Sequence, residues 1–259
     1  MEPRAVRAGH GWAWIVEGYR LFRKSPAVWL ALLLLLFAST RVLLAVPILG
    51  LVMVVLMPLF IVGLMEGCRA LERGERLELG HLLAGFRRNA AQLATIGGVS
   101  LIGNLMLMMI VMEIGGEAIT ALMKTVAKGA AMTPQLAQEM QAATRTVARA
   151  LLVGMAVTLP LFMALWYAPL LVYFNDLNPL AAMKWSLVAC VKNAGAMLVY
   201  GAVIVAGIVV AIPFTTALGQ YDVTLFLLAP VVVPSIYASY KDIFLAGTAP
   251  QTETDSVAG

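Results

Sequence analysis

Of the charged residues in the chain, those between residues 69 and 78 come closest to the pattern of an acid–base catalytic group. Acids and bases alternate along this stretch, with Glu72, Glu75 and Glu78 among Arg69, Arg73 and Arg76. Alternation of this kind is typical of a solvated charged face. The chain contains no nucleophile elbow, phosphate loop or zinc-binding helix motif. We therefore expect no catalytic residue and a protein that is not an enzyme.

Histidine, methionine and cysteine side chains give no indication of a metal or cofactor site. His10 and His81 each lack a second ligand at the spacing that a metal requires. Two cysteines are too few for a disulfide framework, so Cys68 and Cys190 are expected to be free thiols. A methionine cluster without neighbouring cysteine or histidine indicates adaptable packing rather than a copper path, and comprises Met106, Met108, Met109 and Met112. The sequence thus predicts no cofactor and no metal.

Asn104 lies well inside an apolar run, with Ser100 one helical turn earlier. Polar side chains in such a position favour interhelical hydrogen bonding with small-residue packing. A polar site for a substrate within the membrane is the alternative. Three prolines inside apolar runs are expected to kink helices, although they could also open backbone carbonyls to a ligand: Pro58, Pro160 and Pro230.

The composition places most of the chain in lipid. Of 259 residues, 61% are hydrophobic and 12% are charged, and the mean hydropathy is +0.90. Soluble domains carry about 25% charged residues. The net charge of +4 comes from bases that flank apolar runs, which is typical of membrane topology and contact with anionic headgroups. We expect membrane lipids, including anionic ones, as partners, and no nucleic acid.

The elements that must position these residues are six predicted membrane spans. They lie at about 27–40, 46–66, 91–112, 148–173, 195–213 and 223–240. Arg41 marks the first turn, because a base at a hairpin tip can reach water. The amino-terminal residues lack a short apolar core with a small-residue cleavage site, so the first span is expected to be retained. The fold class is therefore all-α and polytopic, with three similarly oriented hairpins.

An amphipathic helix at the membrane interface is predicted before each hairpin. From Trp12, apolar side chains recur at helical spacing with charged ones opposite, a pattern typical of the headgroup region. The second segment has Leu79, Leu82, Leu83 and Phe86 on one face, and the third spans 179–193. Residues 1–11 are basic and expected to be mobile. We expect six bases of these segments to contact lipid headgroups: Arg20, Arg23, Lys24, Arg87, Arg88 and Lys192.

Local signals mark several helix boundaries. Ser25-Pro26 predicts a break and restart of the helix. Gly129 is a predicted C-cap, and Thr133-Pro134 has the pattern of an N-cap followed by proline in the first turn. Both fall within 113–150, the largest interruption between apolar runs. This segment could serve as a docking site for a partner protein, and the oligomeric state is left open.

The same order of features, an amphipathic segment followed by two apolar runs, occurs three times along the chain. The predicted units are about 12–77, 78–177 and 178–245, within a single transmembrane domain, 1–245, that precedes a tail, 246–259, expected to be disordered. With six spans, 13 bases lie on the amino-terminal side and 5 on the other, so both termini are predicted to be cytoplasmic. Units with two spans each keep one orientation, and an inverted-repeat transporter is not indicated.

Several segments resemble an uncharacterised family of proteobacterial six-span inner-membrane proteins: VEGYRLFRKSPAVW, GLMEGCRALERGE, GHLLAGFRRN, WYAPLLVYFND and SIYASYKDIF. The resemblance covers about residues 11–244. More distantly, the pattern is similar to the membrane domain of some glycerophosphodiester phosphodiesterases. The chain has no room for a phosphodiesterase barrel, so that activity does not carry over. The resemblance implies a fold and a location but no catalytic residues.

Two functions from different classes fit these patterns. The first is a non-enzymatic inner-membrane protein with a lipid-associated structural or regulatory role in the envelope. It rests on three basic segments beside spans with few polar groups. The alternative is a small transporter or channel for an amphipathic solute, with a pathway near Asn104 and the prolines within the spans. That alternative predicts a polar or hydrated cavity reaching the middle of the membrane.

Overall fold

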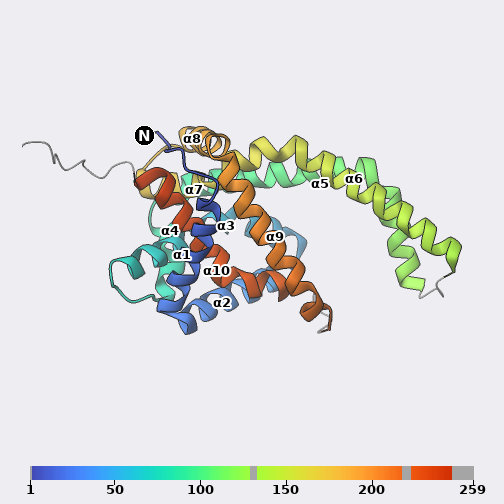
Figure 1. Cartoon of the computed structure of the whole chain (residues 1–259), viewed down its shortest axis with the longest axis horizontal. Helices are drawn as coiled ribbons and strands as arrows, with labels where there is room; N and C mark the ends of the chain where they lie inside the picture. The colour runs from blue at the N-terminus through green and yellow to red at the C-terminus, as the bar shows by residue number, and fades with distance from the viewer. Residues whose placement is uncertain (1, 129–132, 218–222, 247–259) are drawn as a thin grey trace, which may run out of the picture.

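The computed structural model describes residues 2–128, 133–217 and 223–246, and its regular secondary structure there is entirely helical, as predicted (Figure 1). The chain begins with α1 (His10–Lys24), α2 (Pro26–Leu44), α3 (Pro47–Glu72), the short 3-10 helix η1 (Leu79–Leu83) and α4 (Ala84–Arg87). The middle forms α5 (Ala90–Lys128), α6 (Pro134–Trp166) and α7 (Ala168–Asn175). The last elements are α8 (Pro179–Lys192), α9 (Ala194–Ala217), α10 (Val223–Tyr240) and a π-helical turn, η2 (Lys241–Leu245).

Five helical stretches within the described residues are long and apolar enough to cross a membrane. They are Pro26–Leu44, Ile48–Glu72, Ala90–Thr125, Pro134–Asn175 and Ala194–Pro213. Each overlaps one of the first five predicted spans. The sixth predicted span coincides with the 18-residue helix α10, which is not among the five. The membrane-spanning character of the chain is therefore confirmed, whereas a sixth span is not.

Prolines and polar caps determine several helix starts. The first turn of a helix does not need the backbone N–H that proline lacks. Four helices begin in this way, with Pro26, Pro47, Pro134 and Pro179. The Thr133 hydroxyl also accepts a hydrogen bond from the backbone N–H of Leu136 at 3.2 Å. The predicted boundaries at Ser25-Pro26 and Thr133-Pro134 are confirmed, while Gly129 lies outside the described residues.

Helices α5 and α6 are longer than a bilayer requires. At 1.5 Å per residue, the 39 residues of α5 extend about 58 Å and the 33 residues of α6 about 50 Å, against about 30 Å of hydrocarbon. The segment 113–150 interrupts the apolar runs but not the helices, because its described residues continue both α5 and α6. Close packing permits this: a Cβ on Gly115 would lie 3.1 Å from the Ala150 Cβ. In Figure 1 this part, which we call the distal hairpin (113–128 and 133–150), extends away from the other helices.

Glycines also allow α1 to lie directly against α9 and α10. A Cβ on Gly11 would lie 2.3 Å from the carbonyl oxygen of Ala196 in α9. A Cβ on Gly18 would lie 2.5 Å from the carbonyl oxygen of Val231 in α10. Consecutive long helices contact one another as well, in the pairs α2–α3, α5–α6 and α9–α10.

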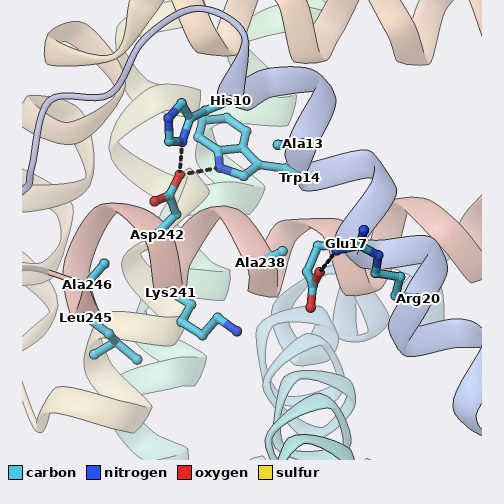
Figure 2. Close-up of a pocket in the computed structure, with 10 residues that line it drawn as sticks. All are labelled: His10, Ala13, Trp14, Glu17, Arg20, Ala238, Lys241, Asp242, Leu245 and Ala246. Carbon is cyan, nitrogen blue, oxygen red and sulfur yellow. Dashed lines mark hydrogen bonds and ion pairs between the residues drawn. The ribbon is translucent and has the colours of Figure 1, made fainter.

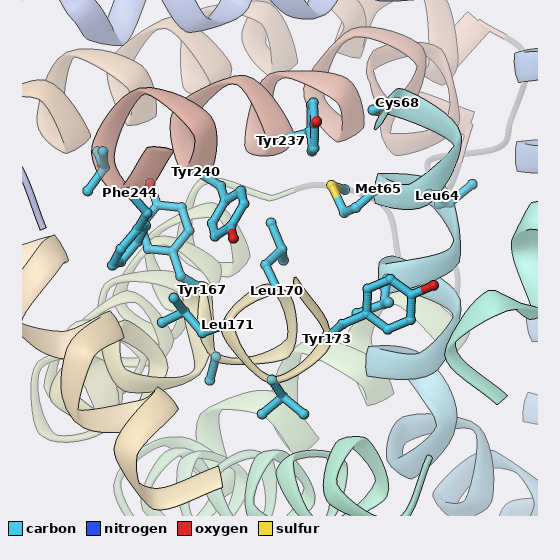
Figure 3. Close-up of a cluster of buried hydrophobic side chains, with 14 of the residues drawn as sticks. Leu64, Met65, Cys68, Tyr167, Leu170, Leu171, Tyr173, Tyr237, Tyr240 and Phe244 are labelled. Atoms are coloured by element: carbon cyan, nitrogen blue, oxygen red, sulfur yellow. The ribbon is translucent and has the colours of Figure 1, made fainter. Parts of the chain in front are cut away.

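A cluster of buried side chains lies where α3, α7, α10 and η2 meet. Figure 3 shows four tyrosines there, together with leucine and methionine side chains from α3 and α7. Tyr167 and Tyr240 are completely buried. The Tyr167 hydroxyl donates to Ser239 Oγ at 3.0 Å, and the Tyr240 hydroxyl donates to Asn175 Oδ1 at 2.6 Å. Buried aromatic rings with satisfied hydroxyls make this region well specified.

Candidate functional site

Polar contacts of the molecule concentrate in a region that we call the basic end. It consists of the ends of α1, α3 and α7, the short elements η1 and α4, the starts of α2, α5 and α9, the turn η2 and residues 2–9. The residue before each of the three helix starts accepts a hydrogen bond from the backbone N–H four residues later, at 3.1, 2.9 and 3.0 Å for Ser25, Asn89 and Asn193. Lys24 adds a link from the end of α1 to the end of α3, because its Nζ donates to the Leu71 carbonyl at 3.0 Å.

Asp176 joins the end of α7 to the start of α5. Asn89 Nδ2 donates to Asp176 Oδ1 at 3.0 Å and to the Val172 carbonyl at 2.9 Å, and Arg88 forms an ion pair with Asp176. The hydrogen bonds from Asn89 and Arg88 hold the pKa of the Asp176 carboxyl below its ordinary value. Asn89 and Asp176 both have positive φ, 57° and 52°, a conformation that Asn and Asp tolerate better than other non-glycine residues.

Asp242 ties the segment before α1, and α1 itself, to η2. His10 Nδ1 and Trp14 Nε1 both donate to Oδ2 of this carboxylate, at 2.7 and 2.9 Å, as Figure 2 shows. Arg4 forms an ion pair with the other oxygen. Burial alone would raise the pKa of Asp242, but the hydrogen bonds from Trp14 and His10 and the charges of His10 and Arg4 lower it overall.

Residues 2–9 were expected to be mobile. They instead contact both the start of α9 and the turn η2. Asn193 Nδ2 donates to the carbonyl of Arg4 at 3.0 Å, and Asn193 Oδ1 accepts from the backbone N–H of Val6 at 2.8 Å. The backbone N–H of Arg4 donates to the Ile243 carbonyl at 2.9 Å. No local sequence pattern indicates these contacts, because the partners lie at least 187 positions apart.

A cavity of about 650 Å³ lies between α1 and the end of α10 with η2 (Figure 2). Three charged side chains line it besides Asp242. Arg20 pairs with Glu17 at 3.2 Å, and Lys241 pairs with Glu72 of α3. Because these charges are paired within the protein, this cavity offers a weak site for a charged ligand.

Five of the six bases predicted to contact headgroups interact with other groups of the protein. Lys24 and Arg88 link helix ends as described above, and Lys192 Nζ lies 3.4 Å from a carboxylate oxygen of residue 2. Within the described residues, Arg20 and Arg23 interact only with side chains of their own helix, Arg23 through the ring of Tyr19 at 5.8 Å. Headgroup contact by these bases stays a prediction. The sixth base lines the cavity described next.

A polar cavity of about 390 Å³ lies between α3, η1 and α4. Glycines bring these elements together: a Cβ on Gly63 would lie 2.4 Å from the Leu82 carbonyl oxygen, and one on Gly85 2.4 Å from that of Leu59. Arg87 makes no hydrogen bond or ion pair within the described residues. Two carboxylates and two guanidinium groups line the cavity, from Glu66, Glu78, Arg87 and Arg88. The polar side chains of His81 and Tyr173 complete its lining.

Asn104 and Ser100 line a third cavity, of about 330 Å³, among apolar side chains of α2, α3 and α5. Asn104 Nδ2 donates to the Ser100 carbonyl at 2.8 Å and lies 3.5 Å from the Ser100 hydroxyl. The amide thus bonds within its own helix rather than across to another. Pro58 lines the same cavity. The other two predicted kink residues lie inside α6 and α10 and do not line it: Pro160 and Pro230.

The described residues contain neither a candidate metal site nor an exposed cysteine. No group of three or more His, Cys, Asp or Glu side chains there could hold a metal ion. Cys68 and Cys190 are free, as predicted, and both are buried. Burial raises the pKa of Cys190 to about 12, so its thiol is not a nucleophile near neutral pH.

Comparison with known proteins supports a membrane location. The chain is 29% identical over 206 residues to a probable inner membrane protein of Burkholderia thailandensis, covering 78% of this chain and 74% of that protein. No protein-family model and no solved structure matches. The distant resemblance to the membrane domain of glycerophosphodiester phosphodiesterases stays a prediction. With five apolar helices of spanning length, the similarity supports an integral, multi-pass protein of the bacterial inner membrane.

Proposed function

We propose that this protein is a non-enzymatic, phospholipid-binding protein of the inner membrane with a structural or regulatory role in the envelope. The observation that supports it most is the separation of charge from the apolar helix interiors. Residues 42–65, 90–112, 150–175 and 194–213 contain no Asp, Glu, Lys or Arg. Exposed bases and a cavity of mixed charge lie at the basic end instead. Groups at that level meet headgroups rather than acyl chains.

In this proposal the basic end faces the cytoplasm and α10 is the sixth span. The pairs α2–α3, α5–α6 and α9–α10 then form three repeats, in each of which the two helices contact one another. Labelling with a membrane-impermeant maleimide in spheroplasts tests the orientation. Gln138→Cys in the distal hairpin should react from outside, and Arg73→Cys beyond the end of α3 should not. The opposite pattern would reverse the orientation.

Thermal unfolding with increasing phosphatidylglycerol tests the binding of anionic lipid. The melting temperature of the purified protein should rise, because a ligand that binds the folded state stabilises it. Arg20→Gln with Arg23→Gln should reduce the rise, since each base near an anionic surface contributes about 1 kcal/mol. Arg145→Gln with Arg149→Gln removes the same charge from the distal hairpin and should leave the rise unchanged. A wild-type protein indifferent to anionic lipid would overturn this function.

The cavity beside Asn104 favours a second candidate, transport of an amphipathic solute. The cavity places Ser100, Asn104 and Pro58 together among apolar side chains. Thiol reagents that act in water distinguish a hydrated path from a dry one, because only a hydrated cysteine ionises readily. Asn104→Cys should react if a path exists, whereas Ile102→Cys, exposed on the same helix outside the cavity, should not. Equal inertness of both variants would exclude this candidate.

A further inference from the structure

The polar cavity between α3, η1 and α4 presents charges of opposite sign from different elements. Glu66 comes from α3 and Glu78 from the residue before η1, whereas Arg87 ends α4. The volume of about 390 Å³ is within the usual range of small-ligand pockets, roughly 300–1,000 Å³. Such a site is suited to a ligand that carries both an anionic and a cationic group.

Two groups that line this cavity are available for a ligand. Glu66 Oε1 accepts from Arg69 Nε at 3.2 Å and Nη2 at 2.7 Å. Glu66 Oε2 lies 2.6 Å from the same Nη2, yet it is buried and accepts no well-directed hydrogen bond within the described residues. A buried carboxylate oxygen in this state is stabilised by any further N–H donor. Arg87, which also lacks a partner there, supplies donors for an anion.

The surroundings of the cavity match a lipid better than a soluble molecule. Three large apolar side chains of η1 and α4 are exposed beside it: Leu79 by 53%, Leu83 by 48% and Phe86 by 38%. Glu66 lies six residues, about 9 Å, before the end of the span in α3, and Arg87 lies three residues before the start of α5. The cavity is therefore at the level where spans end, with acyl-chain contacts available at its side.

We propose that this cavity binds the headgroup of a zwitterionic phospholipid whose amine carries hydrogens, as in phosphatidylethanolamine. Arg87 binds the phosphate, the ammonium donates to Glu66 Oε2, and the acyl chains lie along Leu79, Leu83 and Phe86. This inference rests on the proposed phospholipid-binding function and names its ligand class. It also explains why a cavity among headgroup-contacting bases has two carboxylates in its lining.

Lipid titrations of the full-length protein in detergent test the site, with native mass spectrometry or thermal unfolding as the readout. Phosphatidylethanolamine should bind about tenfold more tightly than phosphatidylcholine with the same chains, since the trimethylated amine cannot donate to Glu66. Arg87→Ala should weaken phosphatidylethanolamine binding about tenfold. Arg73→Ala, also exposed and basic but outside the lining, should leave it unchanged.

Each alternative outcome has a distinct meaning. Equal affinity for the two zwitterionic lipids, or no effect of Arg87→Ala, would overturn the headgroup site. Soluble glycerophosphoethanolamine that competes as strongly as the intact lipid would overturn the acyl-chain contact and assign the cavity to a soluble ligand. A response to phosphatidylglycerol alone would overturn this inference and leave the proposed function standing. No response to any phospholipid would overturn both.

Discussion

The basic end and the distal hairpin consist of the same secondary structure but are held by different interactions. At the basic end, ion pairs join distant parts of the chain: Arg4–Asp242, Arg88–Asp176 and Lys241–Glu72. Side-chain hydrogen bonds described in the distal hairpin are local. Four threonine hydroxyls there donate to the carbonyl four residues earlier, at Thr120, Thr125, Thr144 and Thr146.

This difference shows where the arrangement of the helices is specified. Long-range polar contacts around buried aromatic rings select one way of assembling the helix ends, because each group would lose its partner in another arrangement. The distal hairpin needs only two antiparallel helices with small residues between them. Most described side chains of the distal hairpin are exposed, and regions with few buried apolar contacts are the ones that open most readily. We therefore expect substitutions to be costly at the basic end and mild in the distal hairpin.

The largest contrast is expected from one substitution made at two positions of α5. A Cβ on Gly97 would lie 2.0 Å from the Val55 carbonyl oxygen in α3, whereas one on Gly116 meets only the end of the Met112 side chain, at 3.5 Å. Gly97→Ala forces two backbones apart and should lower the free energy of unfolding by about 3 kcal/mol. Gly116→Ala should raise it by up to about 1 kcal/mol. Thermal unfolding in matched detergent measures both, and equal effects would remove the distinction.

Asp242→Asn should have the next largest effect. Its carboxylate accepts from His10 and Trp14 and pairs with Arg4, and its side chain is only 18% exposed. Loss of the charge should lower the free energy of unfolding at pH 7 by about 2 kcal/mol. Glu139→Gln in the distal hairpin is the matched control and should change it by less than about 0.5 kcal/mol.

The difference between wild type and Asp242→Asn should depend on pH. The folded protein holds the pKa of Asp242 below its ordinary value, which is about 3.9 in an unfolded chain. The stabilisation by the carboxylate is thus fully present above that pH and is lost as the pH falls through the lower folded pKa. Unfolding curves of the two proteins should therefore converge under acid conditions. A gap that stays constant between pH 7 and acid would contradict the assigned role of Asp242.

Local signals explain how much of the fold could be predicted. Ser25-Pro26 and Thr133-Pro134 act within one helical turn, so their effect can be deduced without knowledge of the fold. Uniform apolar runs likewise predicted six spans, five of which overlap helical stretches of spanning length in the described residues. The continuation of α5 beyond its predicted span was missed because charged residues and glycines of 113–117 resemble an interruption. In the folded chain they continue α5, with Gly115 close to α6.

The sequence predicted which bases lie at the candidate site but not the residues that they contact. The bases at the helix junctions were expected there, but their partners lie far along the chain: Arg88 bonds a residue 88 positions away. Asp242 receives its donors from 228 or more positions away, which no periodicity reveals. The lack of a well-directed hydrogen bond at Glu66 Oε2 depends on the orientation of the Arg69 guanidinium with which it is ion-paired, and that orientation requires coordinates. Long-range polar contacts were therefore the part that the sequence could not supply.

Removal of most of the distal hairpin should also have only a small effect on the stability of the remaining protein. Replacing 117–146 by a short Gly-Ser linker keeps the contact between Gly115 and Ala150 and removes no described long-range ion pair. Membrane insertion should persist, and the free energy of unfolding should change by less than about 1 kcal/mol. A partner that docks on this segment should then co-purify with the full-length protein and be lost with the shortened one. Identical co-purification would rule out docking there, and failure of the shortened protein to insert would show that the distal hairpin also specifies the fold.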